Sequence, residues 1–252
     1  HQKFGGISKY YINLINHLDS SVEKSIIAPF YKNYYLNNQN KDAKKFVYID
    51  IKTKYVNFIS KNLNKAYTKF LYNYQTPDIF HFTYFNQEYY LKKKSSYVIT
   101  IYDLIKEKFY NDKFKNEEVN KIKYFSCMDK IICISENTKK DLIDRYKLSP
   151  ELIEVVHLGV SFDKSYIEID NKIPKKPYLL FVGERYRYKN FKNFILAYTK
   201  SNRLKKDFDI LCFGGNSFTS EEINFFKEFR ISQNIKQING SDLELNYVYK
   251  KA

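Results

Sequence analysis

The chain has 252 residues, of which 44% are hydrophobic, enough to fill the core of one large domain or two modest ones. No apolar run approaches the roughly 20 residues that span a bilayer, and residues 1–6 lack the regions of a signal peptide, so we expect a cytoplasmic protein. The 43 Lys and Arg exceed the 28 Asp and Glu, and the net charge of +15 favours anionic partners such as phosphate groups, nucleic acid or an acidic membrane surface.

Short β-branched and aromatic runs alternate with longer segments of helical period, which predicts βαβ units around parallel sheets. Strands are expected at Ser25–Ala28, Phe46–Ile51, Asp78–Phe82, Tyr97–Tyr102, Lys130–Ile134 and Glu154–His157. Helices are expected at Ser8–Leu18, Tyr55–Tyr74, Asn116–Cys127 and Glu136–Tyr146. Residues 1–160 are therefore predicted to form one Rossmann-like α/β domain.

Residues 161–176 are polar, contain Pro174 and have no sustained period, which is typical of an interdomain linker. The alternation then resumes with strands at Tyr178–Val182, Phe208–Phe213 and Ile235–Ile238, and with helices at Asn190–Ser201, at Ser220–Ile231 and from Asp242. Residues 177–252 are predicted to form a second Rossmann-like domain. It is incomplete, because three strands make a small parallel sheet.

The three cysteines, Cys127, Cys133 and Cys212, are widely spaced in apolar surroundings and form no CxxC pair. This spacing argues against a disulfide frame or a zinc site and favours thiols packed in a core. The lysines are scattered along the chain, and a genome poor in G and C also produces such an excess of lysine. We find no zinc-finger spacing, no RNP-like aromatic signature and no basic heptad helix, so a dedicated nucleic-acid-binding motif is not supported.

Glycines and polar residues follow several predicted strands, at the edge where ligands bind in open α/β sheets. The Gly5-Gly6 turn precedes a helix whose first N–H groups can bind an anion, although such a turn is more often structural. His81 and Thr83 lie at the end of the third strand, where a lone histidine is usually packed or solvated. Neither motif decides the function alone.

Asp103 and Ser135 follow the next two strands. A carboxylate at Asp103 can bind sugar hydroxyls or orient a catalytic group, and it can equally cap the next turn. Ser135, with Glu136 in the turn after it, fits the ordinary start of a helix.

Two cations follow the strand Tyr178–Val182 and Gly183. Arg185 and Lys189 lie four residues apart across a turn and can converge on a pair of phosphates, Arg as a bidentate fork and Lys as a point charge. The alternative is a loop of solvated charges. Opposite the Gly5-Gly6 turn of the other domain, this pair would form a diphosphate clamp across a cleft.

Six segments of the chain occur in the order of one known family. They are "GGISKY" at 5–10, "HFTYF" at 81–85, "VITIYDLI" at 98–105, "IICISENTKKDL" at 131–142, "VVHLGV" at 155–160 and "LLFVGERYRYKNF" at 179–191. Together they resemble the family 4 retaining glycosyltransferases of the GT-B fold, in particular the bacterial polysaccharide subgroup that begins with "GGISRY". The resemblance covers nearly the whole chain.

The resemblance implies two Rossmann-like domains facing across a cleft. It implies transfer of a sugar from a GDP- or UDP-linked donor to a polysaccharide or lipid-linked saccharide acceptor, with the anomeric configuration kept. The activity would be that of a hexosyltransferase, mannosyl transfer included, that needs no metal or other cofactor. It would serve cell-surface glycan or lipopolysaccharide synthesis in the cytoplasm, with a peripheral contact at the inner face of the membrane and no nucleic-acid partner.

The matching motifs also imply roles for individual residues. Arg185 and Lys189 match the catalytic pair that stabilises the departing diphosphate. The donor-binding positions are Gly5, Gly6, Gly183, Ser135 and Glu136, and the acceptor-side positions are His81, Thr83, Tyr102 and Asp103. Tyr102 departs from the pattern, because many relatives carry a histidine there.

A second departure concerns the end of the chain. The family's Glu-x7-Glu motif, which holds the donor sugar and ribose, would follow the helix that begins at Asp242, so we expect the chain to be a fragment. The alternative function is a truncated or degenerate noncatalytic module that binds a sugar or an anion. A third hypothesis, a basic nucleic-acid-binding protein, predicts a steeply salt-dependent affinity for DNA.

Overall fold

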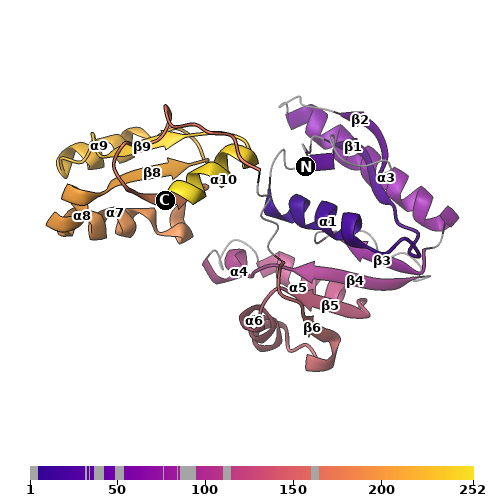
Figure 1. Ribbon diagram of the computed structural model, residues 1–252. Coiled ribbons are helices and arrows are strands. Elements are labelled where there is room, and N and C mark those ends of the chain that lie inside the picture. The colour runs from indigo at the N-terminus through magenta and orange to yellow at the C-terminus, as the bar shows by residue number, and fades with distance from the viewer. Residues whose placement is uncertain are drawn as a thin grey trace. The chain divides into compact units, whose positions relative to one another are not determined.

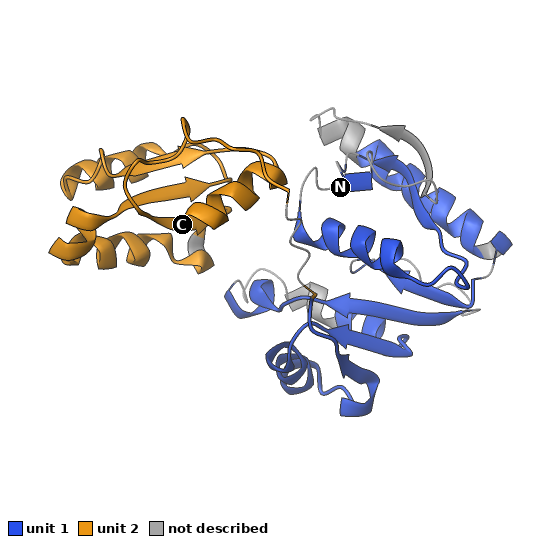
Figure 2. Cartoon of the chain, viewed as in Figure 1, with its two compact units in different colours: residues 1–158 blue, residues 159–252 orange. Residues whose placement is uncertain are grey.

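The computed structural model describes residues 5–31, 33, 35–36, 43–48, 54–75, 77–83, 85, 95–109, 115–159 and 165–252. The chain is an α/β protein with parallel sheets, and it divides into two compact units, residues 1–158 and 159–252 (Figure 2). The segment expected to be a linker, residues 161–176, belongs to the second unit in this division.

In the first unit, helices lie between groups of one or two strands along the described chain (Figure 1). The strands are β1 (Ile26–Tyr31), β2 (Ala43–Tyr48), β3 (Ile79–Phe82), β4 (Ser96–Ile101), β5 (Lys130–Cys133) and β6 (Ile153–Val155). The helices are α1 (Gly6–His17), α3 (Lys54–Gln75), α4 (Ile105–Phe109), α5 (Lys115–Phe125) and α6 (Glu136–Tyr146). β1 and β2 form a parallel pair, and β3-β4-β5-β6 form a parallel sheet in chain order.

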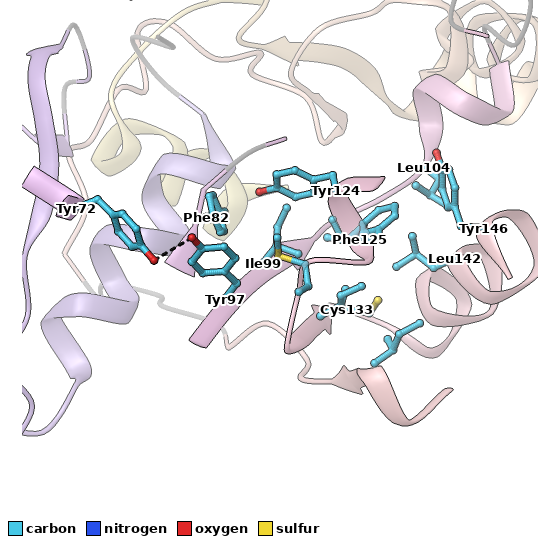
Figure 3. Packing of buried hydrophobic residues seen from close by; sticks show 14 residues of the cluster. Tyr72, Phe82, Tyr97, Ile99, Leu104, Tyr124, Phe125, Cys133, Leu142 and Tyr146 are labelled. Carbon is cyan, nitrogen blue, oxygen red and sulfur yellow. Dashed lines mark hydrogen bonds between the residues drawn. The ribbon is translucent and has the colours of Figure 1, made fainter. Parts of the chain in front are cut away.

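The core of the first unit lies on one face of the four-stranded sheet (Figure 3). Side chains alternate between the two faces of a strand, and Tyr97, Ile99 and Ile101 of β4 all belong to this core. Phe125 of α5 and Leu142 of α6 are fully buried in the same cluster. The sheet therefore carries α5 and α6 on this face.

The second unit has a three-stranded parallel sheet in chain order, with helices on both faces. Its elements are β7 (Tyr178–Val182), α7 (Phe191–Lys200), α8 (Asn202–Asp207), β8 (Asp209–Phe213), α9 (Ser220–Glu228), β9 (Ile235–Ile238) and α10 (Asp242–Lys251). Ile210 and Cys212 of β8 pack with α7 and α9 in one cluster, and Leu211 and Phe213 pack with α10 in another. This alternation along β8 covers both faces of the small sheet.

Residues 165–176, expected to be part of a linker, pack on α10. Ile169 is buried in the cluster that holds α10. Tyr247 Oη donates to Asp170 Oδ1 at 2.5 Å, and Lys172 Nζ pairs with Glu244 Oε1 at 2.7 Å. A polar sequence without period can therefore still be ordered, because its side chains find partners on one helix.

Most expected elements are confirmed, and three of them, α6, β7 and β9, agree with the prediction residue for residue. The expected end of the first strand at Ala28 is wrong, because β1 continues through Pro29 to Tyr31. The missing N–H of Pro29 is tolerated, since β2 is the only described partner of β1. The short helices α4 and α8 were not expected. None of the described helices is long and apolar enough to cross a membrane.

Candidate functional site

The predicted site residues form two groups, one in each unit. In the first unit, two tyrosines of α1 attach this helix to the strands β3 and β4. Tyr11 Oη donates a hydrogen bond to the carbonyl oxygen of Phe82 at 2.8 Å, and Tyr10 Oη lies 3.3 Å from Thr100 Oγ1. Burial raises the pKa of Tyr11 to about 12, so its hydroxyl keeps its proton at neutral pH. The two contacts fix the orientation of α1 on the sheet.

The first turn of α1 carries the predicted glycines. Gly5 precedes the helix in an extended conformation, and no side chain caps the first N–H groups in the part of the chain that the structure describes. A Cβ added at Gly6 would meet nothing within 4 Å. The donor-binding role of both glycines stays a prediction, and the uncapped helix start has the polarity that an anion needs.

His81 lies in β3 and contacts both β4 and α1. Its Nε2 lies 2.9 Å from Thr100 Oγ1, and its ring meets the ring of Tyr11 edge to face at a centroid distance of 5.2 Å. Burial lowers the pKa of His81 to about 4, so the imidazole is neutral at pH 7. His81 is thus packed and hydrogen-bonded, while Thr83, two residues later, is exposed.

Tyr102 directly follows β4, whose last residue is Ile101. Its ring meets Tyr10 edge to face at 5.5 Å, and burial raises the pKa of its hydroxyl above the usual value. The hydroxyl of Tyr102 therefore keeps its proton at neutral pH. The structure brings His81 and Tyr102 together through their shared contacts with α1.

Asp103, also expected on the acceptor side, caps the turn that follows. Its Oδ1 accepts a hydrogen bond from the backbone N–H of Ile105 at 3.0 Å, at the start of α4. Of the two roles considered for this carboxylate, the structure shows the capping contact. The side chain is exposed.

Ser135 and Glu136 begin α6. Ser135 Oγ accepts from the backbone N–H of Thr138 at 3.2 Å, as an N-cap. Thr138 Oγ1 in turn donates to the carbonyl oxygen of Tyr102 at 3.3 Å, which joins the start of α6 to the end of β4. Glu136 is exposed in the first turn, where a negative charge suits the helix dipole.

In the second unit, three glycines follow β7 and β8. Gly183 comes directly after β7 with φ +95°, and Gly214 and Gly215 come directly after β8 with φ +81° and +76°. Glycine adopts these left-handed conformations without a steric cost. Gly183 N donates to the carbonyl oxygen of Phe213 at 2.8 Å, so the ends of the two strands meet.

Lys189 approaches this strand end closely. It lies in the 3-10 turn η3 (Arg187–Lys189), and its Nζ donates a long hydrogen bond of 3.4 Å to the carbonyl oxygen of Val182. A Cβ added at Gly183 would lie only 2.8 Å from this Nζ. The absence of a side chain at Gly183 therefore gives the amine its place, and Lys189 as a residue is exposed.

Arg185 is held by the loop after β8 and by α9. Its Nε donates to Glu222 Oε1 at 2.8 Å, and its Nη2 donates to the carbonyl oxygens of Asn216 and Ser217 at 2.6 and 3.2 Å. The guanidinium carbon lies 4.7 Å from the ring centroid of Phe218. Only 5% of the Arg185 side chain is exposed.

The third guanidinium nitrogen of Arg185, Nη1, has no hydrogen-bond partner among the described residues. It lies beside Gly215, where an added Cβ would be 3.4 Å away. The predicted pair is thus unequal: Lys189 is an exposed amine, and Arg185 is a buried guanidinium with a carboxylate partner. Both lie next to the three glycines at the ends of β7 and β8, which we call the glycine site (Gly183, Gly214 and Gly215).

Three residues at this place were missed from the sequence. The pair Gly214-Gly215 directly follows an apolar strand, a signal that the sequence does contain. Glu222 carries a capping-box signal with Thr219, but its contact with Arg185 joins residues 37 positions apart, which no local pattern shows. No group of three or more His, Cys, Asp or Glu suited to a metal ion occurs in the described residues.

Comparisons with known proteins bear on the family and the fold of the chain. The model of Glycosyltransferase Family 4 matches residues 4–164. Among solved structures, HepE of Anabaena, in complex with UDP and glucose, is similar with a TM-score of 0.61 and 13% identity, over 95% of this chain and 67% of HepE. A comparison with curated protein sequences finds no match.

Two further structures cover this chain completely. They are WaaG, a glycosyltransferase involved in lipopolysaccharide biosynthesis (TM-score 0.59, 12% identity, 71% of WaaG), and the lipopolysaccharide outer core galactosyltransferase WaaB (TM-score 0.54, 18% identity, 69% of WaaB). The chain thus spans about two thirds of the length of each of the three. Their fold is the GT-B fold, to which the two α/β units correspond. The family model matches more than half of the chain, and the chain belongs to glycosyltransferase family 4.

Proposed function

We propose that this chain is that of a retaining glycosyltransferase. The enzyme moves a hexose from a GDP- or UDP-linked donor to a polysaccharide or lipid-linked saccharide in cell-surface glycan synthesis. The observation that carries the proposal is the glycine site with Lys189 and Arg185, in a chain of family 4. The complex of HepE with UDP and glucose is consistent with a nucleotide-linked donor.

The chemistry of the reaction explains why cations are needed beside glycines. When the bond between the sugar and the diphosphate breaks, negative charge grows on the leaving phosphate. A cation already in place stabilises that charge without reorganisation, and it can do so without a metal ion. Lys189 is exposed, and its amine reaches the end of β7, where Gly183 has no side chain to displace it.

In the first unit we assign Gly5 and Gly6 to donor binding, because the N–H groups at the start of α1 are uncapped and can bind an anion. On the acceptor side we assign His81, which is neutral at pH 7 and therefore binds a saccharide hydroxyl without adding charge. Tyr102, which contacts Tyr10 of the same helix α1 that contacts His81 through Tyr11, is assigned to the acceptor side as an aromatic surface.

A transfer assay tests the proposal. The protein is incubated with UDP- and GDP-hexoses and with saccharide acceptors, and the release of nucleotide is measured for the parent and for Arg185→Ala, Lys189→Ala and Lys200→Ala. Loss of one preorganised transition-state donor lowers kcat by about a hundredfold, so we expect this loss in the first two variants. Lys200→Ala removes the same charge from an exposed site in the last turn of α7 and leaves kcat unchanged.

The product of the transfer shows whether the enzyme retains the anomeric configuration. NMR of the product gives the anomeric configuration, which the proposal requires to equal that of the donor. Parent-like turnover of both Arg185→Ala and Lys189→Ala would refute the proposed site. Binding of nucleotide without transfer to any acceptor would support the alternative, a noncatalytic sugar- or anion-binding module.

We also propose a peripheral contact with an anionic membrane surface through α3. The helix exposes a set of apolar side chains at helical spacing: Ile59, Leu63, Phe70 and Tyr74. Its buried side chains include Ser60, Thr68, Leu71 and Tyr72, three of which carry a hydroxyl group. The exposed Lys61 and Lys69 lie on the same helix, and the chain carries a net charge of +15. Exposed aromatic and apolar side chains with lysines are the combination that binds the surface of an anionic bilayer.

A further inference from the structure

We propose that Glu222 is the positioning residue of Arg185. In this role, Glu222 holds the guanidinium where it fixes the loop after β8 and directs Nη1 toward the glycine site. The inference rests on the proposed function, because it assumes that a diphosphate binds at the glycine site. It concerns a residue that no sequence motif pointed to as functional.

The carboxylate of Glu222 serves two partners at once. Oε1 accepts from Arg185 Nε at 2.8 Å, and Oε2 accepts from the backbone N–H of Thr219 at 2.8 Å. Thr219 Oγ1 accepts from the backbone N–H of Glu222 at 3.1 Å, which completes a capping box at the start of α9. Arg185 is therefore attached to the first turn of a helix, where the Glu222 side chain has little freedom.

The cap alone does not require an arginine. Helix α10 begins with the same capping box, made by Ser241 and Glu244, and Glu244 pairs there with Lys172, whose side chain is 49% exposed. The Arg185 side chain is 5% exposed. A buried cation depends on its carboxylate far more than a solvated one does, because water cannot replace the lost partner. The two capping boxes therefore have the same hydrogen bonds at the start of the helix. They differ in the cation that the glutamate binds, which is the buried Arg185 at Glu222 and the half-exposed Lys172 at Glu244.

The position of Arg185 in turn determines the conformation of the loop after β8. Nη2 donates to the carbonyl oxygens of Asn216 and Ser217, the two residues that follow Gly215. Nη1 lies beside Gly215 and donates to no described atom. With Glu222 in place, the guanidinium has one orientation, which shapes the loop and brings positive charge to the glycine site. Without Glu222, two carbonyl oxygens remain to hold it.

Calorimetric titration of the whole chain with inorganic pyrophosphate tests the inference. We compare the parent with Arg185→Ala, Lys189→Ala, Glu222→Ala and the double variant of Arg185 and Glu222. If Glu222 acts through Arg185, Glu222→Ala lowers the affinity about tenfold in the parent and does not lower it further in the Arg185→Ala background, as expected for two groups in contact. The matched control is Glu244→Ala, which removes the other capping box and leaves the affinity unchanged.

The outcomes are distinct. An equal loss of affinity from Glu222→Ala with and without Arg185 would overturn the inference, since Glu222 would then act on the fold alone. Parent-like affinity of Glu222→Ala, with weak binding by Arg185→Ala, would also overturn it and would leave the proposed function standing. If Arg185→Ala and Lys189→Ala both bind pyrophosphate like the parent, the proposed diphosphate site itself fails.

A second variant covers the case in which Glu222→Ala does not fold. Glu222→Gln loses the charge and keeps one carbonyl oxygen, which can accept from Arg185 Nε, while its NH2 group cannot accept from the backbone N–H of Thr219. We expect a loss of about threefold in the parent and none in the Arg185→Ala background. A loss of the same size in both backgrounds would again overturn the inference.

Discussion

Replacement of Gly183 by alanine is expected to lower both the stability of the protein and its affinity for a diphosphate. The added Cβ would lie 2.8 Å from Lys189 Nζ, and because ordinary contacts begin at 3.4 Å, the amine must move by about 0.6 Å to restore an ordinary contact. The lysine end is flexible and can move at little cost. It then leaves the place over the strand end in which we expect it to meet a phosphate.

The stability loss has a separate origin. Gly183 has φ +95°, a conformation that L-residues rarely adopt, and movement of Lys189 does not relieve it. Backbone strain of this kind costs about 1–2 kcal/mol, by which the free energy of unfolding is expected to fall. Gly214→Ala, with φ +81° and only ordinary contacts for its Cβ at 3.7 Å, is expected to lose a similar amount.

Urea unfolding followed by circular dichroism measures the stability, and calorimetric titration with inorganic pyrophosphate measures the affinity. Gly159→Ala serves as the control for both, because its Cβ would meet nothing within 4 Å and its residue lies outside the proposed site. Parent-like unfolding and parent-like affinity of Gly183→Ala would refute the reasoning that this glycine makes room for Lys189.

Three further predictions address other parts of the chain. Burial lowers the pKa of His81 from 6.5 to about 4, so protonation favours the unfolded chain, and stability should fall by about 3 kcal/mol as the pH drops from 6.5 to 4. The stability of His81→Gln, measured by urea unfolding, should not show this loss at low pH. An equal loss of stability in the parent and in His81→Gln would contradict the lowered pKa of His81. Tyr178→Phe removes the hydrogen bond from a buried hydroxyl to the carbonyl oxygen of Val248 (2.7 Å) and should cost about 1 kcal/mol, whereas an unchanged urea midpoint would show that the bond contributes nothing. Phe70→Ser with Tyr74→Ser should weaken binding to phosphatidylglycerol vesicles about tenfold in sedimentation, while Phe109→Ser, an equally exposed residue on α4, should not; equal binding by all proteins would exclude α3 as the contact.

The local parts of the fold could be predicted from the sequence because their signals are local. Helix α6 begins directly after its N-cap Ser135, and β7 ends directly before Gly183, so their bounds follow from neighbouring residues. The short helix α4 was missed because five residues are too few to show a helical period. The order along residues 165–176 was missed because it depends on α10, far along the chain.

The candidate site shows the same limit. The residues Gly183, Arg185 and Lys189 could be named from one segment, and the structure places all three at the end of β7. The burial of Arg185 could not be predicted from the sequence, because it depends on Glu222 and on the loop after β8. Spacing along the chain shows which residues share a loop, and it does not show which of two cations remains exposed.

Labelling of lysines in the presence of ligand tests the central claim most directly. The protein is acetylated with and without saturating UDP, GDP or inorganic pyrophosphate, and the modification of each lysine is measured by mass spectrometry. The account predicts that Lys189 is protected by these ligands, while Lys192 and Lys200, exposed on α7, are modified to the same extent as before. Full modification of Lys189 in the presence of all three ligands would contradict a diphosphate site at the end of β7.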